Sequence, residues 1–228
     1  MILIVLFIGV LLALAVLPQI WVKNVLTRHA DERAEFPGTG AEFARHVLDG
    51  MGLSHVRVEE SRIGDHYDPE AKAIRLSPDH HSRRSLAAVV VAAHEVGHAM
   101  QDATGYGPLA ARSRLARQAQ RVESVGAFVM LAAPLLMLVS KSPHMLILQV
   151  MAGLLIMAFT VLMHLTTLPV EFDASFRRAL PLLREGGYIG AKDQAAARSI
   201  LRAAAFTYVA SAAMSLLDIV RWFRVLRF

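Results

Sequence analysis

Hydrophobic residues in this chain are concentrated in long uncharged runs. Residues 1–22, 124–140 and 142–170 contain no Asp, Glu, Lys or Arg. Crossing the apolar core of a bilayer, roughly 30 Å thick, takes about 20 mostly apolar residues. The pattern therefore predicts an N-terminal transmembrane anchor over residues 1–22 and a transmembrane helical hairpin over residues 124–168.

The two stretches between these runs are polar and basic. Lys and Arg are frequent in residues 23–123 and 169–202, whereas the turn of the predicted hairpin carries only Lys141. Because Lys and Arg are retained on the cytoplasmic side of a membrane, we expect both polar stretches to lie there and to form one domain. The hydrophobic segment and basic tail of residues 203–228 leave two interpretations open, a transmembrane helix or a buried one.

Two helices are predicted within the first polar stretch. Thr39-Gly40-Ala41-Glu42 fits a capping box that opens an amphipathic helix. Its apolar face would consist of Phe43, Val47, Leu48 and Met51. Ser82 or Ser85 would cap a second helix over residues 86–101, which ends near Gly105.

Between these helices the pattern changes to that of short strands. Residues 56–59 alternate between apolar and polar side chains, and residues 74–76 do the same. Asp68-Pro69-Glu70 lies between them and supplies the residue types of a tight turn. The sequence therefore predicts a small β-hairpin.

Composition narrows the chemistry that the chain can perform. Lys and Arg outnumber Asp and Glu by 24 to 19, which gives a net charge of +5. The excess fits the cytoplasmic bias of a membrane protein, and no basic patch with interleaved aromatic residues indicates nucleic-acid binding. Cysteine is absent, so disulfides and thiolate ligands are excluded, and a metal ion must be held by His, Asp or Glu.

His94-Glu95-Val96-Gly97-His98 is the strongest motif in the sequence. Two histidines four positions apart lie one turn apart on one helix face, so both imidazoles can bind one metal ion. Glu95 follows the first ligand and is placed to take a proton from the attacking water. The apolar run of residues 86–93 indicates that this helix is buried. The motif predicts one catalytic Zn²⁺ ion, with two incidental buried histidines as the simpler alternative.

A catalytic zinc ion needs a third protein ligand and an open position for water. Glu171 is the best candidate, because it follows the second hydrophobic arm of the predicted hairpin. When that hairpin is removed, the separation of His98 and Glu171 along the chain is close to that in zinc peptidases with a glutamate as third ligand. The alternative role for Glu171 is an acid at a helix N-terminus, stabilised by the helix dipole.

Several segments resemble the YugP-type family of bacterial membrane neutral zinc metallopeptidases. They are Gly40–Glu42, Ser61–Ser77, Ala92–Gln101, Leu168–Ser175 and Thr207–Ala210. The resemblance covers most of the chain. It implies a mainly α membrane protein of the bacterial plasma membrane, in which a zincin-like α+β catalytic domain is interrupted by the transmembrane hairpin.

The resemblance also implies the roles of the site residues. The chain would be a multi-pass zinc endopeptidase with a gluzincin-like site, in which His94, His98 and Glu171 bind zinc and Glu95 is the general base. Its partners would be the lipid bilayer and protein or peptide substrates, among them membrane or unfolded proteins. The sequence does not indicate an oligomeric state.

Other roles are less strongly specified. Broader relatives carry an acid four residues after the ligand glutamate, but this chain has Ser175 there and an acid at Asp173, which would orient a ligand histidine. Candidates for the oxyanion donor are Tyr208, His164, Tyr106 and Tyr188. The strand formed by Ile74, Arg75 and Leu76 would pair with an extended substrate.

Two alternative functions compete with a membrane-anchored zinc endopeptidase whose active site lies in a cytoplasmic domain. In an intramembrane protease of the site-2 type, the His-Glu motif would lie in a spanning helix with an aspartate ligand, for which Asp49 is the candidate. The polar segment of residues 80–84 argues against that placement. A catalytically inactive zinc-binding membrane scaffold or adaptor would lack Glu95 or close the site with a fourth protein ligand.

Overall fold

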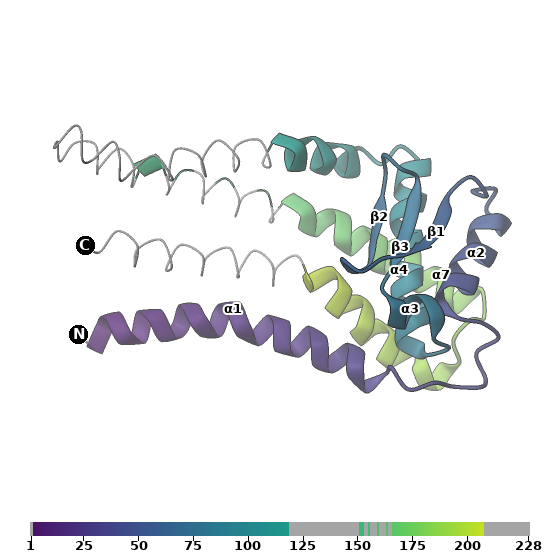
Figure 1. Ribbon diagram of the computed structural model, residues 1–228, viewed down its shortest axis with the longest axis horizontal. Coiled ribbons are helices and arrows are strands. Elements are labelled where there is room, and N and C mark those ends of the chain that lie inside the picture. The colour runs from purple at the N-terminus through teal and green to yellow at the C-terminus, as the bar shows by residue number, and fades with distance from the viewer. Residues whose placement is uncertain are drawn as a thin grey trace. The chain divides into compact units, whose positions relative to one another are not determined.

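The computed structural model describes residues 2–118, 151–152, 155, 159, 163 and 166–207. This part of the chain is mainly helical, with one small sheet (Figure 1). It divides into two compact units, and the candidate metal ligands all lie in the unit formed by Leu17–Leu109 and Leu168–Thr207. That unit joins parts of the two polar stretches, whose exact boundaries stay a prediction.

The predicted transmembrane architecture needs correction. Among the helices in the described ranges, none is both long enough and apolar enough to cross a membrane. Helix α4, at the centre of the fold, has 18 residues and carries the His-Glu motif within it. The predicted hairpin at residues 124–168 falls largely outside the described residues. Where we predicted an anchor over residues 1–22, the structure has helix α1, Ile2–Arg28.

The segment after α1 is held against the rest of its unit by polar contacts. Glu32 forms an isolated antiparallel bridge with Ser85. The Arg33 guanidinium donates two hydrogen bonds, each of 2.9 Å, to the two carboxylate oxygens of Asp193. Asp193 ends the short 3₁₀ helix η2, Ala191–Asp193, so Arg33 joins segments far apart in the sequence.

Helix α2, Gly40–Gly50, is confirmed with the predicted capping box. The Thr39 hydroxyl accepts from the Glu42 amide at 3.2 Å, and the Glu42 carboxylate accepts from the Thr39 amide at 2.7 Å. The predicted apolar face is buried at Phe43, Val47 and Leu48, whereas Met51 is exposed.

The sheet has three strands: β1, Arg57–Glu60; β2, His66–Asp68; and β3, Ala73–Leu76. Their order is β1-β3-β2, with β1 parallel and β2 antiparallel to β3. A hairpin forms between β2 and β3, whereas the two strands that we predicted to form it, residues 56–59 and 74–76, correspond to β1 and β3 and lie parallel. The predicted pairing of Ile74, Arg75 and Leu76 with an extended substrate is also wrong, because it needs a free strand edge and β3 is paired on both sides.

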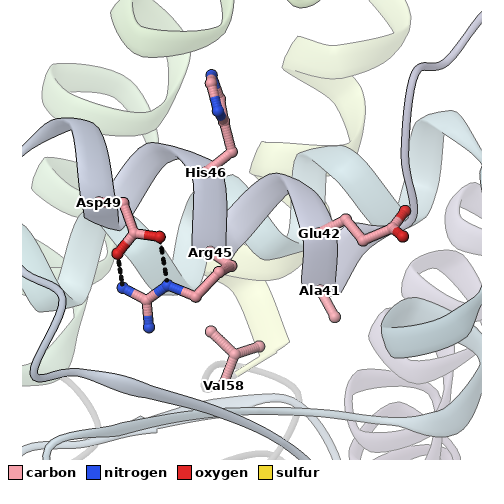
Figure 2. Close-up of a pocket in the computed structure, with 6 residues that line it drawn as sticks. All are labelled: Ala41, Glu42, Arg45, His46, Asp49 and Val58. Carbon is pink, nitrogen blue, oxygen red and sulfur yellow. Dashed lines mark hydrogen bonds and ion pairs between the residues drawn. The ribbon is translucent and has the colours of Figure 1, made fainter.

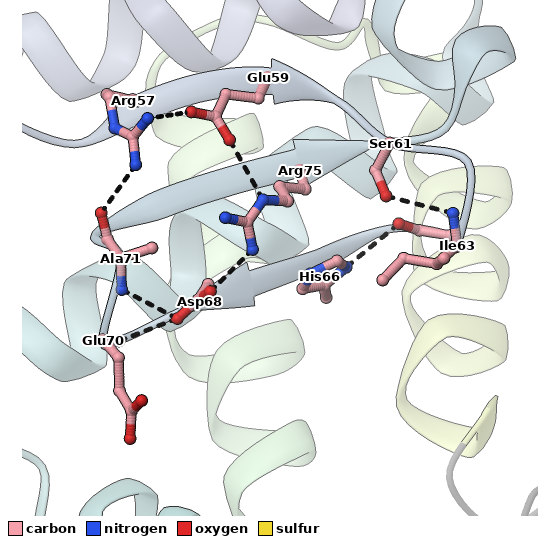
Figure 3. Close-up of polar contacts among 10 residues, drawn as sticks. Arg57, Glu59, Ser61, Ile63, His66, Asp68, Glu70, Ala71 and Arg75 are labelled. Atoms are coloured by element: carbon pink, nitrogen blue, oxygen red, sulfur yellow. Dashed lines mark hydrogen bonds and ion pairs between the residues drawn. The ribbon is translucent and has the colours of Figure 1, made fainter.

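Ion pairs connect the three strands on one face of the sheet (Figure 3). Arg75 donates to Glu59 of β1 at 3.1 Å and to Asp68 of β2 at 2.7 Å, while Arg57 pairs with Glu59. The His66 Nδ1 atom lies 3.2 Å from the Gly64 carbonyl oxygen. These contacts stabilise the sheet and its turns, so this acidic and histidine-containing segment has a structural role.

Helix α4, Leu86–Ala103, is the central element of its unit. The Ser85 hydroxyl caps it by accepting from the Ala88 amide at 3.1 Å, and Gly105 follows with a positive φ of 64°. The helix is buried on nearly all sides, because α2, the short helix α3 (Pro78–Ser82), β2 and β3 pack around it. Such burial explains its almost continuous apolar sequence.

A second helical segment packs against α4. Residues 166–172 are α-helical and continue into the π-helix η1, Asp173–Ala179, and then into α7, Leu180–Glu185. Among the described elements, α4 and η1 share the most extensive contact. Residues 194–207 form a further helix.

Candidate metal centre

The structure brings three residues from two helical segments to one point. His94 and His98 lie one turn apart on α4, and Glu171 lies just before η1. The Glu171 Oε2 atom is 3.1 Å from the His94 Nε2 atom and 3.2 Å from the His98 Nε2 atom. One donor atom from each of the three residues lies within 4.8 Å of the others.

All three side chains are buried, with residue exposures of 3% for His94, 4% for His98 and 0% for Glu171. Burial alone would raise the pKa of the Glu171 carboxyl. The charge and hydrogen bonds of His98 and His94 outweigh that effect and lower the pKa of Glu171 below its ordinary value. The carboxylate is therefore ionised at neutral pH and available to a cation.

The position of the His94 proton follows from Ser175. The Ser175 hydroxyl oxygen lies 2.9 Å from the His94 Nδ1 atom and 3.2 Å from the carbonyl oxygen of Leu201. A carbonyl oxygen only accepts, so the hydroxyl donates to Leu201 and accepts from His94. His94 therefore donates a proton from Nδ1, and Nε2 is the ring nitrogen that faces Glu171.

Gln101 fixes His98 in the same way. Its amide nitrogen donates to the Val170 carbonyl oxygen at 2.8 Å and to the Asp173 carboxylate at 2.9 Å. Its amide oxygen therefore accepts from the His98 Nδ1 atom, at 2.9 Å. The Nε2 atom of His98 also faces Glu171.

These proton positions fit a metal site. With its proton on Nδ1, each imidazole can offer the Nε2 lone pair to a metal ion, and the two Nε2 atoms and the Glu171 carboxylate then present three donor atoms within 4.8 Å of one another. Two imidazole nitrogens and one carboxylate oxygen are a donor set that zinc uses, and three protein ligands leave room for water and substrate.

Gly97 lets the two ligand-bearing segments approach. A methyl group at Gly97 would lie 2.6 Å from the carbonyl oxygen of Ala174 in η1. That distance is too short for a β-carbon, so only glycine fits between His94 and His98 at this contact. The π-helical turn brings the Ala174 carbonyl to this place directly after Glu171.

The structure places the other predicted residues as follows. Glu95 is on α4, buried to 5% exposure beside the ligand His94. Asp173 reaches His98 through Gln101 and pairs with Arg178 at 2.8 Å. These hydrogen bonds hold the pKa of Asp173 below its ordinary value, although burial opposes them.

The tyrosines that we considered as oxyanion donors have packing roles where the structure describes them. The Arg178 guanidinium lies over the Tyr106 ring at 5.6 Å, and the Tyr188 ring packs edge-on against Phe43 at 4.9 Å. Tyr208 and His164 lie outside the described residues, so their roles stay predictions.

Figure 2 shows a pocket of about 450 Å³, and none of the three candidate ligands is among the residues that line it. Its lining comes from α2 and β1: Ala41, Glu42, Arg45, His46, Asp49 and Val58. Asp49 pairs with Arg45 at 2.8 Å, and Glu42 belongs to the capping box. Asp49, the candidate ligand of an intramembrane site, is thus an exposed helix-surface acid rather than part of the described metal cluster.

The sequence reasoning missed three residues of this centre: Gly97, Gln101 and the histidine-orienting role of Ser175. Gln101 lies three positions after His98, on a neighbouring part of the same helix face, and that spacing could have suggested it. Ser175 replaces the acid expected four positions after Glu171. A hydroxyl can accept a hydrogen bond from the same imidazole, so a serine at this position could have indicated a residue that orients a histidine.

A buried helix with two histidines one turn apart and a glutamate from a second helix is an arrangement of zinc-dependent peptidases. The family model described as "Putative neutral zinc metallopeptidase" matches residues 3–227, and the chain belongs to this family. The chain is 38% identical over 213 residues to the "Putative membrane protease YugP" of Bacillus subtilis (strain 168). The aligned region covers 92% of this chain and 91% of that protein. No solved structure matches the chain.

Proposed function

We propose that this protein is a zinc-dependent endopeptidase whose metal is held by His94, His98 and Glu171. The observation that carries the proposal is the convergence of two imidazole Nε2 atoms and one carboxylate oxygen in a buried site, where the Nδ1 atom of each ring is held by a separate hydrogen-bond partner. Family membership supports the same class of reaction.

In the proposed reaction, water attacks the carbonyl carbon of a peptide bond. When bound, zinc would supply Lewis acidity, polarising that carbonyl and making the water more acidic. Glu95 takes one proton from the water as it attacks and delivers it to the leaving amine nitrogen when the carbon–nitrogen bond breaks. Ser175 and Gln101 keep both imidazoles turned towards the site through both steps.

We propose protein or peptide substrates, including unfolded or membrane proteins. The relative in Bacillus subtilis is named a membrane protease, and this supports a location at a membrane for the present chain. The lipid bilayer as a partner and the cytoplasmic orientation of the site stay predictions. They rest on the distribution of basic residues in the sequence.

The proposal is tested by comparing casein cleavage by the purified wild type and by Glu95→Gln, with zinc content measured in both. The substituted amide would keep the shape of the glutamate side chain but could not accept the proton. We expect both proteins to hold zinc and only the wild type to cleave. Equal cleavage by the two would contradict the role of Glu95, and zinc binding without cleavage by either would favour an inactive scaffold.

A further inference from the structure

We propose that Gln101 is a positioning residue of the metal centre, which holds His98 in its ligand orientation and fixes α4 against the segment that carries Glu171. This inference rests on the metal site of the proposed function. Gln101 itself is neither a ligand nor the general base.

The amide of Gln101 is fully buried, and all of its polar atoms are engaged. Its oxygen accepts from the His98 Nδ1 atom, and its nitrogen donates to the Val170 carbonyl and to the Asp173 carboxylate. An amide nitrogen has two hydrogens, and both have an acceptor here. The reverse orientation would place the amide oxygen against two other acceptors, so the amide has one stable orientation.

The three partners of Gln101 lie on both ligand-bearing segments. His98 belongs to α4, whereas Val170 precedes Glu171 and Asp173 follows it closely in the chain. One side chain therefore joins the ring of one ligand to the backbone beside another. Losing Gln101 would free the His98 ring to rotate and remove the tie that sets the separation of His98 and Glu171.

Asp173 and Arg178 in turn hold the Gln101 amide. The Arg178 Nε atom donates to the same Asp173 oxygen that accepts from Gln101, at 2.8 Å. The resulting chain of contacts runs from His98 through Gln101 and Asp173 to Arg178. Partners of this kind, one step removed from the metal, commonly change metal affinity by about 10–100-fold when they are lost.

The test uses Gln101→Met in the full-length protein. Methionine keeps the length of the side chain and most of its volume but makes none of the three hydrogen bonds. We would measure zinc affinity by competition with a chromophoric chelator and record the visible spectrum of the Co²⁺-loaded protein, which reports the geometry of the ligands. We expect zinc binding at least about ten-fold weaker than in the wild type and a shifted Co²⁺ spectrum.

His80→Leu is the matched control. It removes a partly buried polar contact between residues outside the metal cluster, the 2.8 Å pair between His80 and Asp65. We expect a lower melting temperature with wild-type zinc affinity and an unchanged Co²⁺ spectrum. The control separates loss of general stability from loss of ligand geometry.

Wild-type affinity and spectrum in Gln101→Met would overturn the proposal, even with a lower melting temperature, because Gln101 would then be structural only. If Gln101→Met does not fold, Gln101→Asn replaces it, because the shorter amide cannot reach all three partners. Weaker zinc binding and a shifted Co²⁺ spectrum are again expected, and wild-type values of both would again overturn the proposal. A wild type that binds neither zinc nor cobalt would overturn the metal site itself, and with it the proposed function.

Discussion

Gly97 lies so close to Ala174 that a methyl group on its α-carbon would stand 2.6 Å from the Ala174 carbonyl oxygen. The contact joins the middle of the His-Glu motif to the π-helical turn that follows Glu171. The separation between Glu171 and the other two candidate metal ligands, His94 and His98, thus depends on the absence of a side chain at position 97.

We expect Gly97→Ala to push α4 and η1 apart. Overpacking of this kind costs about 1–3 kcal/mol of stability, and the displacement of the ligands should weaken zinc binding roughly ten-fold or more. Thermal unfolding and a zinc competition titration would measure the two effects. The control is Gly50→Ala, at a helical position where a methyl group meets no atom within 4 Å. Equal zinc affinity in Gly97→Ala and the control would contradict the role of this contact.

Ser175→Ala should weaken zinc binding without removing a ligand. The His94 Nδ1–H would lose its acceptor, which leaves a buried donor unpaired and the ring free to turn. We expect a loss of about ten-fold in zinc affinity by chelator competition. Ser61→Ala removes another buried hydroxyl, one that accepts from the Ile63 amide, and should bind zinc like the wild type. Unchanged affinity in Ser175→Ala would show that His94 does not need this partner.

Asp65 should stabilise the fold at neutral pH but not in acid. Its carboxylate accepts from the Ser77 amide at 2.7 Å and contacts the His80 ring at 2.8 Å. Burial alone would raise the pKa of Asp65, but these partners lower it below the ordinary value of 3.8. A group whose pKa is lower in the folded state stabilises that state above its ordinary pKa and loses the effect as the pH falls through its folded pKa.

The measurement is the difference in melting temperature between the metal-free wild type and Asp65→Asn as a function of pH. We expect the wild type to be more stable from neutral pH down to about pH 4, and the difference to shrink below that. A difference that grows as the pH falls below about 4 would have the wrong sign and would refute this interpretation.

The local signals in the sequence predicted the two helices that have strong caps. Thr39 with Glu42 marked α2, and Ser82 or Ser85 before an apolar run marked α4, for which the structure uses Ser85. Each helix cap involves residues three or four positions apart in the chain, so it can be recognised from the sequence without knowledge of the tertiary structure. The ligand set His94, His98 and Glu171 was predicted from the motif and the family resemblance, and the structure brings these residues together.

Features that depend on distant contacts were not predicted. The parallel pairing of β1 with β3 joins two strands that β2 separates in the chain, and the short strand β2 has no pattern long enough to reveal it. The π-helix after Glu171 has no sequence signature of its own. The uncharged runs predicted transmembrane spans, but hydropathy over a window of residues does not specify where helices begin and end. None of the helices in the described ranges is both long enough and apolar enough to cross a membrane.

Zinc titration of the metal-free protein tests the central claim most directly, with the wild type beside Glu171→Gln and Asp49→Asn. Asp49→Asn changes an acid outside the metal cluster and is the matched control. We expect one zinc ion per chain for the wild type and the control, and an affinity reduced more than about 100-fold for Glu171→Gln, whose amide is a poor zinc ligand. A wild type without zinc, or a Glu171→Gln variant that binds zinc as tightly as the wild type, would contradict the assignment of this site.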